Sequence, residues 1–414
     1  MHLRPRSVPA VLLAATLVAC SGGGGVGPDA GDGGDGGDGS AAAAAGTTTS
    51  LAPFEGDDFY EVPDPLPEGE PGTLIRYEPV DGAGDAGPAT FRMMYLSESV
   101  AGEPIAVTGL AAIPDGDAPP GGRPTLTIAH GTTGIADECA PSKSPRASEG
   151  LLFGPAADRG YLVALSDYEG LGTPGRHPYL VGESEGRSVL DAAKAAAQLP
   201  GADAGRELAI MGYSQGGHGA LWAAQLAESW APDHEVLGTV AGAPATELPV
   251  ILRAGSAGPV AGFVMMIIAG FAEAYPEADA ADVLTAAGEA ALDQVDEGCV
   301  GDVVGGFASA GEQLIEPEAA TTEPWTDLMA ENDPGRVVAD GPVLVLHSAA
   351  DDLVPAALSE IMVGRMCELG QVVERRVYED GLGHGEAAPG ALTDGLEWLD
   401  GLAGGAEPVS TCGS

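Results

Sequence analysis

The sequence is short of basic residues. Its 414 residues include 17 Lys and Arg against 62 Asp and Glu, a formal net charge of −45, and only Lys143 and Lys194 are lysines. Proteins that bind a phosphate backbone do so mainly through Lys and Arg. The composition therefore excludes nucleic acid as a partner. The acidic surface favours solubility and carries no information about the fold.

Aromatic residues and closely spaced cysteines are also scarce. Aromatic residues make up 5% of the chain and apolar residues 44%, which predicts a sizeable core built from Ala, Val and Leu. No two of the five cysteines have the C-x-x-C spacing of zinc and redox sites. This spacing argues against a zinc or redox site, and we expect no cofactor. The length allows two or three domains, or one large α/β domain.

The N-terminus has the features of an export signal. Two arginines precede an apolar run, residues 8–19, that is too short to span a bilayer. The run ends in LVAC at residues 17–20, which resembles the lipobox of bacterial lipoproteins, where the cysteine becomes the lipidated first residue. We predict a signal peptide over residues 1–19 and a lipid anchor at Cys20. The protein would be a membrane-anchored lipoprotein at the cell surface or in the periplasm, or secreted if the signal is an ordinary one.

The segment from 20 to 50 is rich in Gly, Asp, Ala and Thr. It contains too little apolar surface to offset the entropy of ordering it, which predicts a flexible tether. A calcium-binding repeat would need a nine-residue period with a large apolar residue in each turn, and the segment has neither.

Four cysteines remain beyond the predicted anchor. They are Cys139, Cys299, Cys367 and Cys412. In an oxidising compartment they predict two structural disulfides, and the count alone allows three pairings.

From residue 51 onward, apolar strand patterns alternate with helical patterns. The strand-like runs are 91–96, 105–113, 125–129, 161–166, 207–211, 342–346 and 372–378, and the helical ones are 186–198 and 215–229. Buried strands that alternate with helices predict an α/β domain over 51–412, with a mostly parallel sheet covered on both faces. Between about 248 and 325 an Ala-rich helical pattern interrupts the alternation, and we expect a helical insertion that packs on the core or lines a pocket.

One pentad carries a chemical signal. Residues 212–216 read Gly-Tyr-Ser-Gln-Gly, which fits G-x-S-x-G, and they follow an apolar strand and open a helical pattern. That context is typical of the nucleophile elbow, where glycines permit a strained turn that lifts the serine hydroxyl off the sheet. We therefore predict Ser214 as a nucleophile. The backbone N–H of Gln215, at the helix N-terminus, would face the oxyanion.

A serine nucleophile needs a base and an acid. On this type of fold they follow in the chain order Ser, Asp or Glu, then His. His384, in the turn GLGHG, is the only histidine after the acid candidates, because His347 precedes them. The acid would be Asp351 or Asp352, in the loop after the strand 342–346. We prefer Asp351 from its D-x-x-V-P context, and Asp352 would then cap the following helix.

The oxyanion hole needs a second backbone donor. The turn HGTTG at residues 130–134 follows the strand 125–129, and in such sheets this turn lies near the elbow. We predict the N–H of Thr132 as the partner of that of Gln215. His130 and His218 are interpreted as structural residues.

At these positions the chain resembles the secretory lipase family of the α/β-hydrolases. The matching stretches are 129–142, 167–172, 177–180 and 212–217, and the likeness spans most of residues 60–410. The resemblance implies an α/β-hydrolase fold, a helical lid where the insertion lies, and hydrolysis of lipid or other carboxylic esters without a metal. It also implies pairing of Cys139 with Cys299 and of Cys367 with Cys412.

These features together predict a serine esterase or lipase that acts through an acyl-enzyme. Ser214 would attack the ester while His384 takes its proton and Asp351 holds His384. The apolar run 263–271 would cover the acyl chain, since each buried methylene contributes about 0.8 kcal/mol. A serine peptidase or acyltransferase on the same fold, and a non-catalytic surface-binding lipoprotein, are the alternatives.

Overall fold

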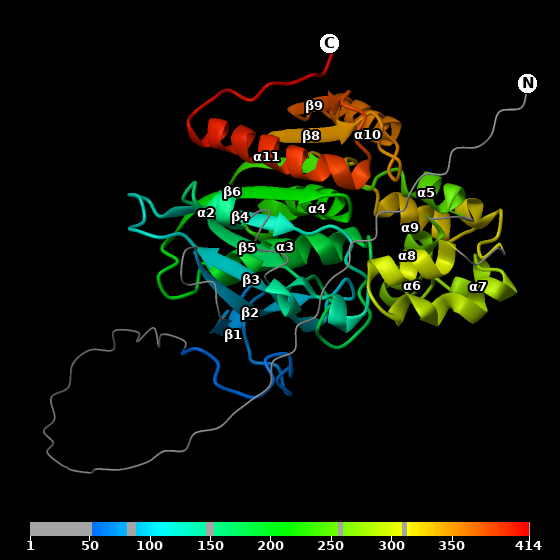
Figure 1. Ribbon diagram of the computed structural model, residues 1–414, viewed down its shortest axis with the longest axis horizontal. Coiled ribbons are helices and arrows are strands. Elements are labelled where there is room, and N and C mark those ends of the chain that lie inside the picture. Colours follow the sequence, from blue (N-terminus) through cyan, green and yellow to red (C-terminus); the bar gives the residue numbers. More distant parts are fainter. Residues whose placement is uncertain (1–51, 81–87, 146–152, 256–259, 309–312, 414) are drawn as a thin grey trace, which may run out of the picture. The chain divides into compact units, whose positions relative to one another are not determined.

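The computed structural model describes residues 52–80, 88–145, 153–255, 260–308 and 313–413. The predicted signal peptide, Cys20 and the tether lie outside these residues. The described chain forms a nine-stranded sheet in the order β1-β2-β3-β5-β4-β6-β7-β8-β9 (Figure 1). The strands are β1 (Leu74–Pro79), β2 (Ala89–Glu98), β3 (Pro104–Ile113), β4 (Arg123–Ala129), β5 (Leu162–Ser166), β6 (Ala204–Tyr213), β7 (Glu235–Gly242), β8 (Val343–Ser348) and β9 (Val373–Tyr378).

The sheet has an antiparallel edge and a parallel body. Strands β1, β2, β3 and β5 pair antiparallel in that order, whereas every pairing from β5 through β4 and β6 to β9 is parallel. This confirms the predicted mostly parallel sheet. The carboxyl ends of the parallel strands share one edge, where open α/β sheets bind their ligands.

Helices cover both faces of the sheet. On one face lie α3 (Gly182–Ala196), α4 (Gln215–Trp230) and α10 (Ala356–Glu368), and on the other α2 (Gly154–Ala157) and α11 (His384–Ala403). In β6, Leu208 and Ile210 pack toward the first face, and Ala209 and Met211 toward the second. A strand buried on both sides in this way reads as a continuous apolar run.

The predicted helical insertion lies between β7 and β8. Its helices are α5 (Leu248–Ala254), α6 (Ala261–Ala274), α7 (Ala286–Ala291), α8 (Val300–Ala308) and α9 (Trp325–Glu331), with short 3-10 turns η4 (Ala280–Asp282), η5 (Leu292–Asp296) and η6 (Ala319–Thr321). In Figure 1 these helices gather beside the sheet. Helix α6 forms the centre of a separate apolar core, where Met265, Met266 and Ile268 are fully buried.

Most of the apolar run 263–271 therefore faces the inside of the insertion, and its expected contact with an acyl chain stays a prediction. The same holds for the action of the insertion as a lid. Among the described residues, no helix combines the length and hydropathy that a membrane span requires.

Two disulfides fasten segments that are distant in sequence. Cys139, in the turn η1 (Asp137–Cys139), is bonded to Cys299, the residue before α8. Beside this bond Val300 N donates to Thr133 O at 2.8 Å. Cys367, in α10, is bonded to Cys412 near the C-terminus. Both pairs are those that the resemblance implies, and the first ties the insertion to the loop after β4.

Candidate active site

Ser214 stands in a strained turn between β6 and α4. Its backbone has φ 62° and ψ −121°, a conformation that non-glycine residues rarely adopt. Ser214 N donates to Gly242 O at 2.8 Å, and Ser214 O accepts from His218 N at 3.2 Å. Such strain persists only where the surroundings enforce it, and it is typical of functional sites.

The glycines of the pentad are required by close packing around this turn. A Cβ on Gly212 would overlap Gly216 O, and a Cβ on Gly216 would overlap Ala129 O at the end of β4. The elbow helix thus begins directly against the neighbouring strand. The G-x-S-x-G pattern follows from this contact as well as from the sharpness of the turn.

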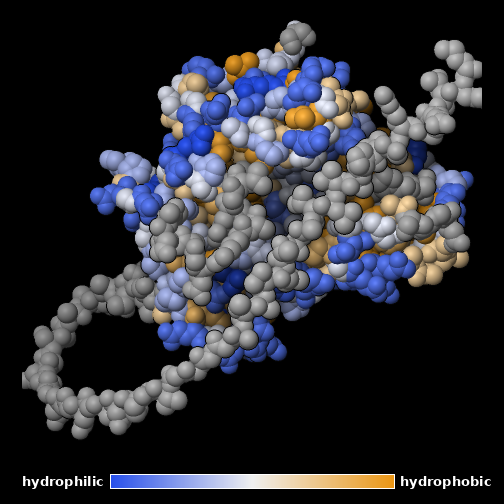
Figure 2. Space-filling model, in the orientation of Figure 1, coloured by the Kyte–Doolittle hydropathy of each residue, from blue (hydrophilic) through white to orange (hydrophobic). Residues whose placement is uncertain are grey.

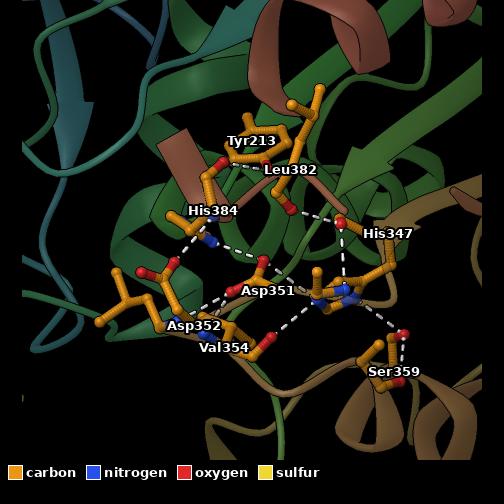
Figure 3. A network of polar contacts seen from close by, with 12 residues as sticks. Tyr213, His347, Asp351, Asp352, Val354, Ser359, Leu382 and His384 are labelled. Carbon is orange, nitrogen blue, oxygen red and sulfur yellow. Dashed lines mark hydrogen bonds and ion pairs between the residues drawn. The ribbon is translucent and has the colours of Figure 1, made fainter. Parts of the chain in front are cut away.

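Asp351 and His384 form a hydrogen-bonded pair (Figure 3). Asp351 Oδ2 lies 2.7 Å from His384 Nδ1. Its Oδ1 accepts from Leu353 N at 2.9 Å and from Val354 N at 2.7 Å. A carboxylate only accepts, so His384 carries a proton on Nδ1 and its Nε2 is left to act as a base.

The Asp351 side chain is fully buried and is kept ionised. Burial alone would raise the pKa of its carboxyl, but hydrogen bonds from His347 and His384 lower that pKa well below its usual range. His347 Nε2 lies 3.4 Å from Oδ2 and contacts Val354 O at 2.8 Å. This preorganised negative charge suits a residue that stabilises an imidazolium.

Asp352 has a different partner from the one we predicted. We expected it to cap the helix that follows, but α10 begins after Pro355 without a side-chain cap. Asp352 Oδ1 instead accepts from the backbone N–H of His384 at 3.0 Å. Our placement of His384 on a flexible glycine turn is wrong as well, because His384 is the first residue of α11.

Tyr213 was missed by the sequence reasoning. Its hydroxyl donates to His384 O at 2.6 Å, and its ring centroid lies 5.1 Å from that of the imidazole. Nearby, Ser348 Oγ donates to Leu382 O at 2.6 Å. The backbone of His384 is therefore held at its N–H by Asp352 and at its carbonyl by Tyr213.

The structure brings the predicted acid, Asp351, and the predicted base, His384, together and sets His384 beside the elbow. His384 packs on Tyr213, the residue before Ser214. Ser214 Oγ itself makes no hydrogen bond within the described part of the chain, so the pair is not yet joined to the serine. Such contacts are often long in the free enzyme and tighten when substrate binds.

Two backbone N–H groups are available beside the serine. Gln215 is the first residue of α4, so its N–H has no partner within the helix. The loop after β4 lies against the elbow, since a Cβ on Gly131 would be 3.9 Å from Ser214 Cβ. Thr132 N has no acceptor among the residues described, and Thr132 Oγ1 contacts Tyr179 OH at 2.7 Å.

The remaining histidines near the site are buried and fully engaged. His130 contacts Gly131 O at 2.7 Å and Asp167 O at 3.2 Å. His218 contacts Glu185 Oε2 at 2.6 Å. Burial lowers the pKa of His177 to about 4, which keeps its imidazole neutral at pH 7. These contacts match the structural interpretation of His130 and His218.

A cavity of about 500 Å³ opens beside the loop and the elbow. Its lining combines residues 130–133 of that loop, the cysteines of the Cys139–Cys299 disulfide, apolar residues and the polar Glu138 and Ser144. The apolar lining includes Ile128, Leu165, Tyr213, Val300 and Leu392. Over the described ranges, no group of three or more His, Cys, Asp and Glu side chains could hold a metal ion.

A mostly parallel sheet, a strained serine between strand and helix, and an Asp–His pair at the same edge define an α/β-hydrolase of the lipase and esterase class. The family model of the secretory lipases matches residues 146–410. The chain belongs to the secretory lipase family and is a carboxylic-ester hydrolase. Family membership and the two disulfides indicate an exported protein.

Individual relatives agree with this assignment. Lipase A of Moesziomyces aphidis is 26% identical over 349 residues, which cover 78% of this chain and 74% of that protein. The secreted triacylglycerol lipase LIP4 of Malassezia globosa is 30% identical over 247 residues, 55% of this chain and 51% of that protein. The structure of Candida antarctica lipase A in its closed state superimposes with a TM-score of 0.72 at 24% identity, covering 86% of this chain and 88% of that one.

Proposed function

We propose that Ser214, His384 and Asp351 hydrolyse carboxylic esters through an acyl-enzyme. The observation that carries the proposal is the 2.7 Å hydrogen bond between Asp351 and His384, at the sheet edge where Ser214 stands in its strained turn. A serine hydroxyl is a poor nucleophile until a base takes its proton. An imidazole whose Nδ1 is occupied by a carboxylate is suited to that role.

The reaction proceeds in two halves. As Ser214 Oγ bonds to the ester carbonyl carbon, its proton passes to His384 Nε2, and the carbonyl oxygen becomes an oxyanion. The N–H groups of Gln215 and Thr132 donate to this oxyanion. The carbon–oxygen bond to the alcohol then breaks, and the leaving oxygen takes the proton from His384. Water repeats the sequence on the acyl-enzyme and releases the carboxylic acid and free Ser214.

The substrate is an ester with an apolar acyl group, which we assign to the cavity beside Thr132 and Tyr213. Pockets of this volume with mainly apolar linings are typical binding sites for small ligands. The triacylglycerol substrate printed in the name of the Malassezia relative makes a lipid ester a natural candidate. Because Cys299 and Val300 of the insertion line this cavity, we also infer that the insertion acts as the lid that the resemblance to the secretory lipases implies.

The first test removes the nucleophile. Ser214→Ala should abolish hydrolysis of p-nitrophenyl butyrate, because it removes the hydroxyl that we assign to the acyl-enzyme, and should leave the circular dichroism spectrum unchanged. A fluorophosphonate should label the wild type and not the variant. Undiminished hydrolysis by Ser214→Ala would refute the proposal. Faster turnover of a peptide, or of acyl transfer to an added alcohol, than of simple esters would favour the alternative enzyme classes.

We also propose that the chain is held at a membrane by a lipid on Cys20. The support is the LVAC sequence at the end of the short apolar run and the Gly- and Asp-rich segment that follows.

A further inference from the structure

A buried hydrogen-bond network lies beneath the elbow and is not used by the reaction steps above. Its centre is the side chain of Gln215, which is 1% exposed. Gln215 Nε2 lies 2.8 Å from Glu185 Oε1 and 2.9 Å from His177 Nε2. Gln215 Oε1 is buried and accepts no hydrogen bond within the described residues. A buried acceptor left unpaired requires an explanation.

The partners allow the amide only this orientation. His177 Nδ1 faces Glu169 O at 2.8 Å, and a carbonyl only accepts, so Nδ1 carries the proton and Nε2 is an acceptor. Glu185 Oε1 is an acceptor as well. The Gln215 amide must therefore donate both of its N–H bonds, and the opposite orientation would set two pairs of acceptors against each other.

Glu185 is itself fixed from several elements. It lies in α3 and is fully buried, and its Oε1 also accepts from Leu180 N at 3.1 Å. Its Oε2 is 2.6 Å from His218 Nδ1, and His218 Nε2 donates to Asn332 O at 2.8 Å. Glu185 thus links α3 with two residues of α4 and, through His218, with the segment that follows α9.

We propose that Glu185 is a positioning residue that sets the oxyanion hole through the side chain of Gln215. The inference rests on the proposed function, because it assigns the Gln215 N–H to the oxyanion. The backbone of residue 215 carries that N–H, and its side chain is held at two points by Glu185 and His177. The Glu185 carboxylate is paired with His218 Nδ1, so its contribution to the oxyanion hole is geometric: it fixes the position of residue 215 through the Gln215 side chain.

Two variants separate hydrogen bonding from charge. Glu185→Gln keeps the contacts without the charge: its Oε1 can accept from Gln215 and Leu180, and its Nε2 can donate to His218 Nδ1 when the His218 ring is neutral and protonated on Nε2 only. Glu185→Leu removes every one of these hydrogen bonds. Gln215→Met keeps the backbone N–H and the side-chain length but loses the two hydrogen bonds. Gln371→Met is the matched control, because Gln371 is also buried with two hydrogen bonds to backbone, far from the elbow.

The measurements are kcat and KM for p-nitrophenyl butyrate and the inhibition constant of butylboronic acid, which forms a tetrahedral anion on a serine. All are corrected for folded enzyme by fluorophosphonate titration. We expect Glu185→Leu and Gln215→Met to lower kcat by about 10- to 100-fold, because small displacements of an oxyanion donor have costs of this size. Boronate affinity should fall in parallel, and KM should stay within about threefold.

Glu185→Gln and Gln371→Met should both stay near the wild-type kcat. If Gln215→Met retains full kcat and boronate affinity while Ser214→Ala is inactive, the inference is overturned and the proposed function stands. A Glu185→Gln variant as defective as Glu185→Leu overturns it too, since charge would then be the active property. If Glu185→Leu does not fold, Gln215→Met decides. Activity in Ser214→Ala would overturn the proposed function and this inference with it.

Discussion

The two adjacent aspartates have identical side chains, and only their positions give them different contacts. Asp351 reaches the imidazole of His384, and Asp352 reaches its backbone N–H. The first contact acts on the protonation of the ring and the second on the location of the helix start. Both depend on the loop after β8 facing the loop after β9, which parallel pairing of these neighbouring strands ensures.

At this scale we predict unequal losses from the two aspartates. Asp351→Asn should lower kcat by about 10³- to 10⁴-fold, because an amide cannot stabilise the imidazolium and favours the wrong tautomer. Asp352→Asn should lower kcat less than about tenfold, since its amide oxygen can still accept from His384 N. Steady-state kinetics on p-nitrophenyl butyrate measures both, and equal losses would contradict the division of roles.

Acid unfolding of the same pair gives an independent readout. The folded-state pKa of Asp351 lies below its unfolded value of about 3.9. Its ionised form therefore contributes stability that is present above about pH 4 and is lost as pH falls toward the folded-state pKa. Asp351→Asn lacks this contribution, so the stability gap between wild type and variant should narrow below about pH 4.

At the scale of elements, the apolar runs of the sequence predict seven of the nine strands that the structure describes, and no run was predicted for β1 or β7. The runs 125–129 and 207–211 lie within β4 and β6, and the helical pattern from 215 matches α4. The sequence did not predict the start of α11 at His384, because three glycines and Pro389 surround it. The contact that stabilises this start comes from Asp352, thirty-two residues earlier. The role of Glu185 was not predicted either, because its hydrogen-bond partners Gln215 and His218 lie on another helix, and no spacing within the sequence indicates these contacts.

The Cys139–Cys299 disulfide should affect catalysis as well as stability. Each disulfide closes a long loop, of 160 residues here and of 45 for Cys367–Cys412, and removing either by double alanine substitution should cost about 2–5 kcal/mol of unfolding free energy. Only the first bond adjoins the loop that carries Thr132. We therefore expect kcat to fall several-fold in Cys139→Ala/Cys299→Ala and to stay unchanged in Cys367→Ala/Cys412→Ala.

Denaturant titration and steady-state kinetics on the two double variants check this pair of expectations. Both should be made in the otherwise intact chain. A loss of kcat of the same size in both would show that the effect is general destabilisation and is not transmitted through the loop.

On the scale of the whole molecule, the net charge bears on how an exported protein attaches to a membrane. The coloured part of the face drawn in Figure 2 is mostly hydrophilic. Among the residues that the structure describes, the exposed large apolar ones are few and come from several segments, for example Val250, Val338 and Val409. A net charge of −45 keeps such a surface soluble. It also repels anionic surfaces, so attachment to a membrane would depend on the proposed lipid and receive no help from basic residues.

This reasoning predicts a clear change of location. Cys20→Ser should move the enzyme from the membrane fraction to the soluble exported fraction, because the only acylation site proposed would be lost. Ester hydrolysis measured in the two fractions, together with partition into detergent, reports the shift. The specific activity of the released enzyme on a soluble ester should equal that of the wild type. A variant that still sediments with membranes would rule out the anchor.

The insertion between β7 and β8 has a consequence for how this chain can diverge. These two strands are paired neighbours, and a parallel crossover needs little more than a dozen residues, yet residues 243–342 make the connection here. Most of that length is surplus to closing the sheet. Insertions and deletions can therefore accumulate in it over evolutionary time without disturbing the sheet, while the serine, the aspartate and the histidine keep their places.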